Sequence, residues 1–394
     1  MKIGLFLDCW EPFIGGVVVS TKSLRQGLES LGHEVYIITT EAVPKHKEED
    51  PYIIRIKGAI PLFFKSVKGC RLVITYKKHI SQIQALNLDI IHVHTEAGIG
   101  YLGLYIHKKL NIPLIYTMHS MYHVFLEKNN FLWIKIFRKI IIKLLDHILK
   151  QFISKANIIV VPTKKTLNFL TKRYPIDKEY KIIPSGIQLQ KFNPENYFEK
   201  EVNILKEKLG LTDFFVCLFI GRISKEKEID FLIDNFAVFH KQNDKSKFLI
   251  IGDGPEKKNL QKKVKKLNLK DKIIFLNFVP NDQIGLYYQL GSVFLNASLF
   301  ETQGLTYIEA LSASLPVVAR YDEALDGVIQ NNENGFLYND KEEFFQALKC
   351  LYKDKVKHEK MSLKAKQSTY NYKQEIFAEK MIDVYKIAIS RNNK

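Results

Sequence analysis

Short apolar runs alternate with amphipathic stretches along this chain, and they fall into two successive series. The first series consists of KIGLFL, EVYIITT, DIIHVHT, PLIYTMH, NIIVVPT and KIIPSG, and the second of FFVCLFIG, FLIIGDG, IIFLNFV, SVFLNAS and LPVVAR. Runs of this length, rich in β-branched and aromatic residues, are typical of buried strands. Strands that alternate with helical patterns predict parallel, doubly wound sheets. We therefore expect an α/β protein with two Rossmann-like domains that face each other across a cleft.

A polar segment and a C-terminal helical pattern mark the expected domain boundaries. Residues 186–212 are polar and hold no apolar run, so we interpret them as a linker, while 373–390 form a helical pattern with no strand after it. The 394 residues suffice for two cores, because single cores stop growing near roughly 250–300 residues. We predict a first domain over 1–190, a second over 191–372, and a helix over 373–394 that returns to the first domain. Ligands of such sheets bind at the carboxyl ends of the strands.

One predicted helix, residues 131–152, combines a wide apolar face with a basic edge. Its polar residues recur every three to four positions, at Lys135, Arg138, Lys139, Lys143, Asp146 and Lys150. Such a helix suits a membrane interface, although a helix buried against the sheet with a solvated Lys edge would show the same pattern. Residues 59–78 repeat the mixture of apolar and basic residues. We predict that the membrane-binding residues are Lys65, Lys68, Arg71, Trp133, Lys135, Arg138, Lys139 and Lys143.

The positive charge of the chain is concentrated in one region. The formal net charge is +17, and residues 51–165 contain 18 Lys and Arg against 4 Asp and Glu. Such a patch could attract nucleic acid, an anionic membrane or an acidic partner. Most of these residues are Lys, which suits anionic headgroups better than bidentate base recognition by Arg. We therefore expect anionic membrane lipids as partners, and no nucleic acid.

The cysteines and the N-terminus bear on location. Cys9, Cys70, Cys217 and Cys350 have neither metal-ligand nor framework spacing, which indicates a reducing compartment. The N-terminal apolar run has five residues before Asp8, too short for a signal peptide. No uncharged apolar stretch approaches the roughly 18 residues that span a bilayer. We expect a protein of the cytosol or of a membrane surface.

The segment ETQGLTYIEA, residues 301–310, is the strongest candidate for chemistry. It follows a predicted strand, and its glycine, Gly304, precedes a predicted helix. The amino end of a helix offers free N–H groups and a positive dipole end to an anion. Glu301 in the loop and Glu309 in the helix could accept hydrogen bonds from hydroxyl groups. A ligand with both phosphates and hydroxyls, such as a nucleotide sugar, would fit, although two ordinary surface carboxylates remain the alternative.

Three further strand ends carry candidate ligand groups. Arg222 and Lys227 follow the first strand of the second series and could hold a pyrophosphate. Gly15 and Gly16 follow the first strand of the chain, where the backbone could approach a phosphate closely. His119 ends another strand and could contact a sugar hydroxyl or a phosphate oxygen. The alternatives are an ordinary charged loop at Arg222 and Lys227, a simple turn at Gly15 and Gly16, and a structural histidine at His119.

Two features of the sequence argue against a nicotinamide cofactor and against a metal site. Residues 98–103, GIGYLG, match the dinucleotide fingerprint, but the next strand lacks an acidic residue near its end to bind a ribose. We interpret these glycines as helix packing, and keep a nicotinamide-dependent oxidoreductase as an alternative. The chain contains no D-x-D pair, so we expect no metal ligands and charge neutralisation by basic groups and helix dipoles.

Taken together, these motifs resemble a known family. GGV near the start, His119, GRISKEK, GDGP and the E-x7-E of Glu301 to Glu309 occur in the order found in family GT4 of the retaining GT-B glycosyltransferases. The resemblance covers nearly the whole chain. The opening forty residues and KSVKGCRLVITYKK are more narrowly similar to bacterial 1,2-diacylglycerol 3-glucosyltransferases.

The resemblance implies a role for each candidate residue. Arg222 and Lys227 would hold the diphosphate, with Gly16, flanked by Gly15 and Val17, approaching it from the other domain. The amides of Gly304 and Leu305 would cap it. Glu309 would bind the ribose, Glu301 the sugar hydroxyls, and His119 the sugar near the reacting carbon. The catalytic residues are then His119, Arg222, Lys227 and Glu301.

The resemblance also implies the activity. It points to a peripheral enzyme at the cytoplasmic face of the cell membrane, with an acceptor- and membrane-binding first domain and a nucleotide-sugar-binding second domain. This enzyme would move glucose from UDP-glucose to diacylglycerol, with no tightly bound cofactor and with any Mg²⁺ stimulation independent of protein ligands. UDP-galactose, another lipid or soluble acceptor, and a non-catalytic membrane-binding protein stay open as alternatives.

Overall fold

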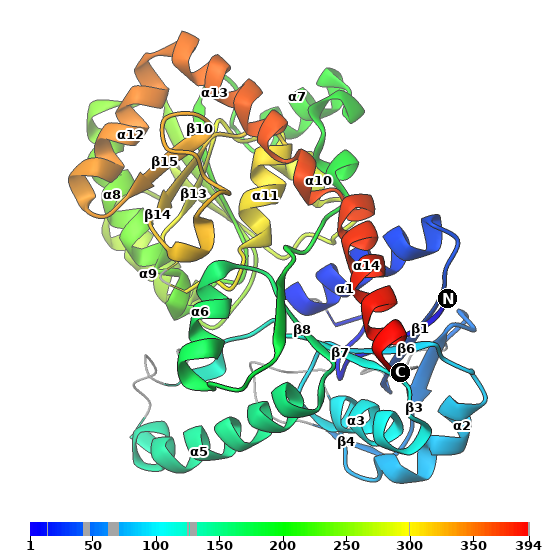
Figure 1. Ribbon diagram of the computed structural model, residues 1–394. Coiled ribbons are helices and arrows are strands. Elements are labelled where there is room, and N and C mark those ends of the chain that lie inside the picture. The colour runs from blue at the N-terminus through cyan, green and yellow to red at the C-terminus, as the bar shows by residue number, and fades with distance from the viewer. Residues whose placement is uncertain are drawn as a thin grey trace. The chain divides into compact units, whose positions relative to one another are not determined.

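The computed structural model of the protein describes residues 1–13, 15–41, 48–61, 71–123, 126, 132–298 and 300–392, with 59–61, 76 and 132–136 described by their backbone alone. The chain forms two compact units (Figure 1). The first comprises Met1–Ile187 and Gln374–Lys394, and the second Gln188–Lys373. Each unit is built around its own parallel sheet, which the two series of apolar runs predicted.

The first unit contains a seven-stranded sheet in the order β3-β2-β1-β6-β7-β8-β9, with parallel neighbours throughout. Its strands are β1 (Lys2–Phe6), β2 (Glu34–Thr40), β3 (Ile53–Ile56), β6 (Ile90–Val93), β7 (Leu114–Thr117), β8 (Ile158–Val161) and β9 (Glu179–Ile182). The strand order reverses at β1, which lies between β2 and β6. Such a switch point opens a crevice at the carboxyl ends of β1 and β6.

Helices cover both faces of this sheet. They are α1 (Gly16–Ser30), α2 (Ile80–Gln84), α3 (Gly98–Leu110), α5 (Leu132–Lys155), α6 (Lys164–Arg173) and α14 (Gln374–Asn392). Buried residues of α1 and α14 share one core with Ile3 and Leu5 of β1. The two helices lie side by side in Figure 1, and a Cβ at Gly27 of α1 would lie 2.6 Å from the Gln374 carbonyl oxygen. The C-terminal helix is thus part of the first unit.

The glycines of GIGYLG serve helix packing, as the sequence indicated. All three lie in α3, where a Cβ at Gly98 would lie 2.2 Å from the Val73 carbonyl oxygen. A Cβ at Gly100 would lie 2.0 Å from the Thr95 carbonyl oxygen. Since these distances are far below van der Waals contact, only glycine fits at either position.

Two short strands escaped the sequence pattern near the basic stretch 59–78. Strands β4 (Ala59–Pro61) and β5 (Arg71–Val73) form an antiparallel pair. Residues 62–70, which include the predicted membrane-binding Lys65 and Lys68, lie outside the described residues. Runs of three residues are shorter than the pattern that predicts a strand.

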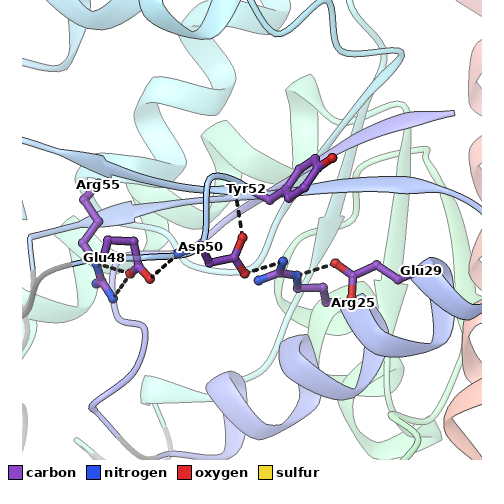
Figure 2. A network of polar contacts seen from close by, with 6 residues as sticks. All are labelled: Arg25, Glu29, Glu48, Asp50, Tyr52 and Arg55. Carbon is purple, nitrogen blue, oxygen red and sulfur yellow. Dashed lines mark hydrogen bonds and ion pairs between the residues drawn. The ribbon is translucent and has the colours of Figure 1, made fainter.

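A network of ion pairs holds the edge strand β3 to the unit (Figure 2). Arg25 of α1 donates from Nε to Glu29 and from Nη2 to Asp50, each at 2.7 Å. Arg55 of β3 donates from Nε to Glu48 at 2.8 Å. These contacts link α1 to the segment that leads into β3.

The second unit contains a six-stranded parallel sheet in the order β12-β11-β10-β13-β14-β15. Its strands are β10 (Phe215–Ile220), β11 (Ser246–Ile251), β12 (Ile273–Leu276), β13 (Val293–Asn296), β14 (Val317–Arg320) and β15 (Gly335–Tyr338). Its helices are α7 (Glu199–Lys208), α8 (Ile229–Gln242), α9 (Lys257–Lys266), α10 (Ile284–Tyr288), α11 (Leu305–Ser312), α12 (Lys341–Lys353) and α13 (Lys355–Ser368). Strand β15 was not predicted, because GFLY is short and follows a polar turn.

The segment 186–212 is not a bare linker, which corrects the sequence interpretation. It contains helix α7 and two 3₁₀ turns, Leu189–Phe192 and Pro194–Asn196. Ser312 of α11 donates to the Leu189 carbonyl at 3.0 Å, and Gln289 donates to the Phe192 carbonyl at 2.9 Å. The first part of this segment is therefore packed onto the second unit.

Two observations bear on the expected location. Among the described residues, Cys217 and Cys350 are free thiols. None of the helices in the described part of the chain has both the length and the apolar character needed to cross a bilayer.

Candidate functional site

The loop between β13 and α11 has the geometry of an anion seat. Gly304 caps α11 with φ +79° and ψ 65°, and no side chain caps this helix. A Cβ at Gly304 would lie 2.4 Å from Cδ2 of Tyr307. Both the left-handed conformation and the close ring favour glycine. The first amides of α11, beginning with Leu305, thus follow a glycine turn without a side-chain cap, as a phosphate-binding helix requires.

Lys227 and Glu301 meet at the same edge of the sheet. The Lys227 Nζ donates to Glu301 Oε1 at 2.6 Å, although the residues lie 74 positions apart. Lys227 ends the 3₁₀ turn Lys225–Lys227, which follows β10, and Glu301 follows β13. The neighbouring pairing of β10 and β13 explains the contact. A cation and a carboxylate so placed could bind a phosphate and a hydroxyl group on one ligand.

The loop with Arg222 is shaped by the GDGP turn. Gly252 has a φ of +145°, and a Cβ there would lie 2.0 Å from the Gly221 carbonyl oxygen. Gly254 has a φ of +159°, and a Cβ there would lie 2.1 Å from the Ile223 carbonyl oxygen. Arg222, between those two carbonyls, is exposed. Its guanidinium has no ion pair with any side chain that the structure describes. The turn glycines therefore let two loops pack closely while the guanidinium stays available to a ligand.

Glu309 lies in α11 and is partly exposed. The Tyr288 hydroxyl donates to its Oε2 at 2.7 Å. Burial raises the pKa of Glu309, while the Tyr288 hydrogen bond and the charge of Lys191 lower it. One carboxylate oxygen is thus fixed by Tyr288, and the other is left to accept hydrogen bonds from a ligand.

In the first unit, Gly15 and Gly16 begin α1. Gly15 is the extended N-cap residue, and a Cβ at Gly16 would meet no atom within 4 Å. Neither glycine is required by a left-handed backbone, so the open space at Gly16 is the feature compatible with a ligand, while the neighbouring Val17 packs against the core. The preceding loop is held by Arg55, which donates to the Glu11 carbonyl at 2.8 Å.

His119, after β7, belongs to a cluster of three histidines with His92 in β6 and His94 directly after it. His94 Nδ1 lies 2.9 Å from His119 Nε2. His92 bonds on both ring nitrogens, to the Tyr385 hydroxyl at 2.8 Å and to the Thr117 hydroxyl at 2.6 Å. Burial lowers the pKa of all three, that of His119 to about 4. The cluster is therefore neutral near pH 7, and His119, which is partly exposed, can reach a ligand.

Two carboxylates lie at the same edge of this sheet. Asp8, after β1, accepts from the Ile99 amide at 2.9 Å and from the Thr95 hydroxyl, and it caps the start of α3. Glu96, before α3, accepts a hydrogen bond from the Tyr116 hydroxyl. The sequence interpretation singled out neither residue as a site.

Comparison with known proteins supplies the family. Residues 14–191 match the family model described as Glycosyltransferase Family 4, and residues 201–368 match Glycosyl transferases group 1. The chain is 41% identical over 396 residues to an alpha-monoglucosyldiacylglycerol synthase of Acholeplasma laidlawii, covering 100% of this chain and 99% of the relative. This chain belongs to glycosyltransferase family 4. A Streptococcus pneumoniae protein of the same name is 33% identical, over 86% of this chain and 75% of the relative.

Solved structures place this family 4 protein in the GT-B fold. Sucrose-phosphate synthase from Thermosynechococcus elongatus matches with a TM-score of 0.79 at 19% identity, covering 99% of both chains. Anabaena HepE in complex with UDP-glucose matches with a TM-score of 0.76 at 14% identity, covering 98% of this chain and 100% of the other. The expected fold class is confirmed, and the oxidoreductase alternative loses its basis in GIGYLG.

The next feature is the set of side chains that could bind a metal ion in the described part of the chain. Across the described ranges, no group of three or more His, Cys, Asp or Glu side chains is placed to hold a metal ion. In the second unit, Arg222 and Lys227 are cationic groups at the sheet edge, and the helix end at Gly304 adds a positive dipole end.

Helix α5 carries most of the predicted membrane-binding residues. Phe137, Ile140 and Leu144 are 52%, 66% and 58% exposed, so an apolar face is open to solvent. Lys139 and Lys143 are exposed beside it, and Arg138 is half-buried. Trp133 and Lys135 are described by their backbone alone. This exposure favours the interfacial interpretation of α5 over a fully buried helix.

Arg71 differs from the other predicted membrane-binding residues. It lies in β5 and pairs with Glu41 at 3.3 Å, and its side chain is only 18% exposed. The ion pair with Glu41 favours a structural role for Arg71 over a role in membrane binding.

The inner side of α5 is tied to the sheet by a polar anchor. Asp146 accepts from Arg173 Nε at 2.7 Å and from the Tyr174 hydroxyl at 2.6 Å. His123, after β7, lies 2.9 Å from the same carboxylate. Burial alone would raise the pKa of Asp146, but the hydrogen bonds from Arg173 and Tyr174 outweigh burial and lower it to about 2. The anchor links α5 to the segment that follows His119.

Proposed function

We propose that this family 4 protein is a peripheral membrane hexosyltransferase that moves glucose from UDP-glucose to 1,2-diacylglycerol with retention of configuration, giving α-monoglucosyldiacylglycerol. The observation that carries the proposal is the 41% identity, over the full chain, to a relative named for this product. HepE, solved with UDP-glucose, supports a UDP-sugar donor. The site of action would be the cytoplasmic face of the cell membrane, where anionic lipids attract the basic first unit.

Each candidate residue receives a role in donor binding. We assign the diphosphate to Arg222 and Lys227, supported by their cationic side chains after β10. The α11 amides at Gly304 and Leu305 would cap it. Glu309 would accept from the ribose.

The remaining donor contacts concern the sugar and the first unit. Glu301 would accept from the sugar hydroxyls, and a ring N–H of His119 would donate to an oxygen near the reacting carbon. The backbone at Gly15, Gly16 and Val17 would approach the diphosphate.

Retention follows from the chemistry proposed for the bond exchange. The acceptor hydroxyl oxygen forms a bond to the anomeric carbon on the face from which UDP departs. The bond between that carbon and the phosphate oxygen breaks, and this oxygen takes the hydroxyl proton. No carboxylate nucleophile is needed, and the leaving charge is stabilised by Arg222, Lys227 and the helix end.

Membrane attachment is assigned to α5. Its exposed apolar side chains, Phe137, Ile140 and Leu144, would enter the headgroup region, while Lys139 and Lys143 attract anionic lipids. Exchange of the three apolar residues for Ser should weaken vesicle binding at every salt concentration. Exchange of the two lysines should weaken it chiefly at low salt, because screening already removes their attraction at high salt.

The test is transfer of label into lipid. The protein is incubated with labelled UDP-glucose or UDP-galactose and vesicles of diacylglycerol with an anionic lipid, and the lipids are separated by thin-layer chromatography. We expect a labelled, diacylglycerol-dependent glycolipid from UDP-glucose only. Labelled lipid from UDP-galactose would contradict the proposed donor. Labelled product that forms only with another acceptor would contradict diacylglycerol as the acceptor.

Site variants separate the donor site from membrane binding. Arg222→Ala and Glu309→Ala should each nearly abolish transfer and leave vesicle sedimentation unchanged. Wild-type turnover in either variant would contradict the role assigned to that residue.

A further inference from the structure

Glu96 lies at a position where an acceptor could meet the edge of the first sheet. Strand β6 ends at Val93 and α3 begins at Gly98, so Glu96 sits in the short connection between them. Its side chain is partly exposed, and its hydrogen-bonding side-chain partner in the described part of the chain is Tyr116 of β7. Tyr116 itself is fully buried. The carboxylate is thus oriented by Tyr116 and by the backbone amide of Glu96 itself, and its partly exposed oxygens can accept a further hydrogen bond from a ligand.

The neighbouring Asp8 shows what a structural carboxylate looks like at this edge. Asp8 is 6% exposed and accepts from the Thr95 hydroxyl and the Ile99 amide. The helix α3 depends on these contacts for its start. Glu96, by contrast, accepts from the Tyr116 hydroxyl and forms no ion pair with a described side chain, so no cation compensates its charge.

Glu96 and His119 come after neighbouring parallel strands. Val93 of β6 is opposite Tyr116 of β7. Glu96 follows the end of β6 and His119 the end of β7, so both lie at the same edge of the sheet.

The two side chains serve opposite faces of the sheet. The hydroxyl of Tyr116 donates to Glu96, and the centroid of its ring lies 5.5 Å from that of Phe152 in α5. The histidine cluster instead contacts Tyr385 of α14. Glu96 therefore lies on the side of α5, from which a lipid bound at that helix would approach.

The electrostatic environment makes Glu96 an unusually basic carboxylate. Burial raises its pKa to about 7, and the charge of Asp8 contributes, while the Tyr116 hydrogen bond acts in the opposite direction. The other titratable group that faces it is Tyr122. A carboxylate of higher basicity is a stronger hydrogen-bond acceptor for a neutral hydroxyl group.

We propose that Glu96 is a catalytic residue of the acceptor subsite, whose carboxylate accepts a hydrogen bond from the free primary hydroxyl of the lipid acceptor and orients its oxygen for attack. This inference rests on the proposed function. It adds the acceptor-binding group, which the donor residues do not supply. The proton ends on the departing phosphate oxygen, so Glu96 is ionised before and after the reaction.

The first test separates transfer to lipid from transfer to water. UDP release from UDP-glucose is measured with and without diacylglycerol vesicles for wild type, Glu96→Gln and the control Glu29→Gln, whose residue pairs with Arg25 on α1. We expect Glu96→Gln to lower lipid transfer roughly 10- to 100-fold, with acceptor-independent UDP release and the KM for UDP-glucose unchanged. The control should match the wild type.

The outcomes distinguish this proposal from the proposed function. Lipid transfer by Glu96→Gln within twofold of the wild type would overturn the role of Glu96 alone. An equal loss of lipid transfer and of UDP release would also overturn it, because Glu96 would then act on the donor or on folding. A wild-type protein that gives no diacylglycerol product would overturn both proposals.

The pH profile provides a second readout that a structural role would not move. Because ionised Glu96 is the acceptor, lipid transfer should rise with pH through about 7, the pKa of Glu96. Tyr116→Phe removes a hydrogen bond that lowers this pKa, so the acid limb should move to higher pH. Glu96→Gln should abolish the limb. An acid limb unchanged in both variants would contradict the proposal.

Discussion

The hydrogen bond between His94 and His119 can be removed by a single substitution, and its loss should be visible in catalysis. His94 is 2% exposed, and its Nε2 has no partner among the described residues. Since burial lowers the pKa of both rings, each carries one proton near pH 7. A buried N–H without a partner is rarer than a buried acceptor without one. We infer that His94 carries its proton on Nδ1 and donates it to His119 Nε2.

This arrangement fixes the tautomer of His119. With Nε2 as an acceptor, the proton of His119 must lie on Nδ1, where it can be donated to the sugar. His94→Leu removes the donor at 2.9 Å and lets His119 change tautomer or rotate. The loss of one buried hydrogen bond is worth about 1–3 kcal/mol, which corresponds to roughly 5- to 150-fold in kcat/KM. His94→Asn keeps an N–H donor near the position of Nδ1 and should recover most of the activity.

The assay combines steady-state transfer with nitrogen-15 NMR of the histidines. We expect the leucine variant to lose kcat/KM and to show a changed His119 tautomer, with thermal unfolding close to that of the wild type. The asparagine variant should resemble the wild type in both measurements. Wild-type kcat/KM in the leucine variant, or equal losses in the two variants, would refute the reasoning.

Three further outcomes follow from the geometry. Gly304→Ala should destabilise the second unit to urea and weaken UDP binding, whereas Gly327→Ala, with φ +81° and open space for a Cβ, should show only the conformational cost of about 1–2 kcal/mol. Lys227→Ala should weaken UDP binding in calorimetry by about 1.5–3 kcal/mol, with exposed Lys225→Ala as the unaffected control. The lowered histidine pKa values imply stability that is present above pH 6.5 and is lost as pH falls towards about 4, the pKa of His119. Urea unfolding at stepped pH would check this sign, and a stability that rises on acidification through this range would contradict it.

The sheets were predictable because their strands are buried on both faces. A parallel strand between two helical layers must be apolar along its whole length, so it appears as a continuous run. The strands that escaped prediction are short or lie at an edge, where this demand is weaker. Strand β3 has four residues, of which only Ile56 is buried, and Arg55 in it pairs with Glu48. Helix α7 escaped for a related reason, since none of its residues is buried.

The candidate site residues can be selected from the sequence only to the extent that strand ends indicate a ligand edge. Arg222, Lys227 and His119 follow apolar runs, so the rule for parallel sheets selects them. Their partners come from distant parts of the chain. Lys227 meets Glu301 across 74 positions, and Tyr385 reaches His92 across 293. No local pattern encodes such a pairing, because it is decided by strand order and by where the C-terminal helix packs.

The segment HVH, residues 92–94, shows where prediction from sequence stops. The period of two places both histidines on one face of β6, and this much is local. The two nevertheless differ in what surrounds them. His92 has a partner on each ring nitrogen, from β7 and from α14, which identifies it as a structural group. His94 has a partner on one nitrogen only, and that partner is the partly exposed His119. The difference between a core histidine and a positioning residue therefore lies in the number of hydrogen-bond partners that the tertiary structure brings to each ring.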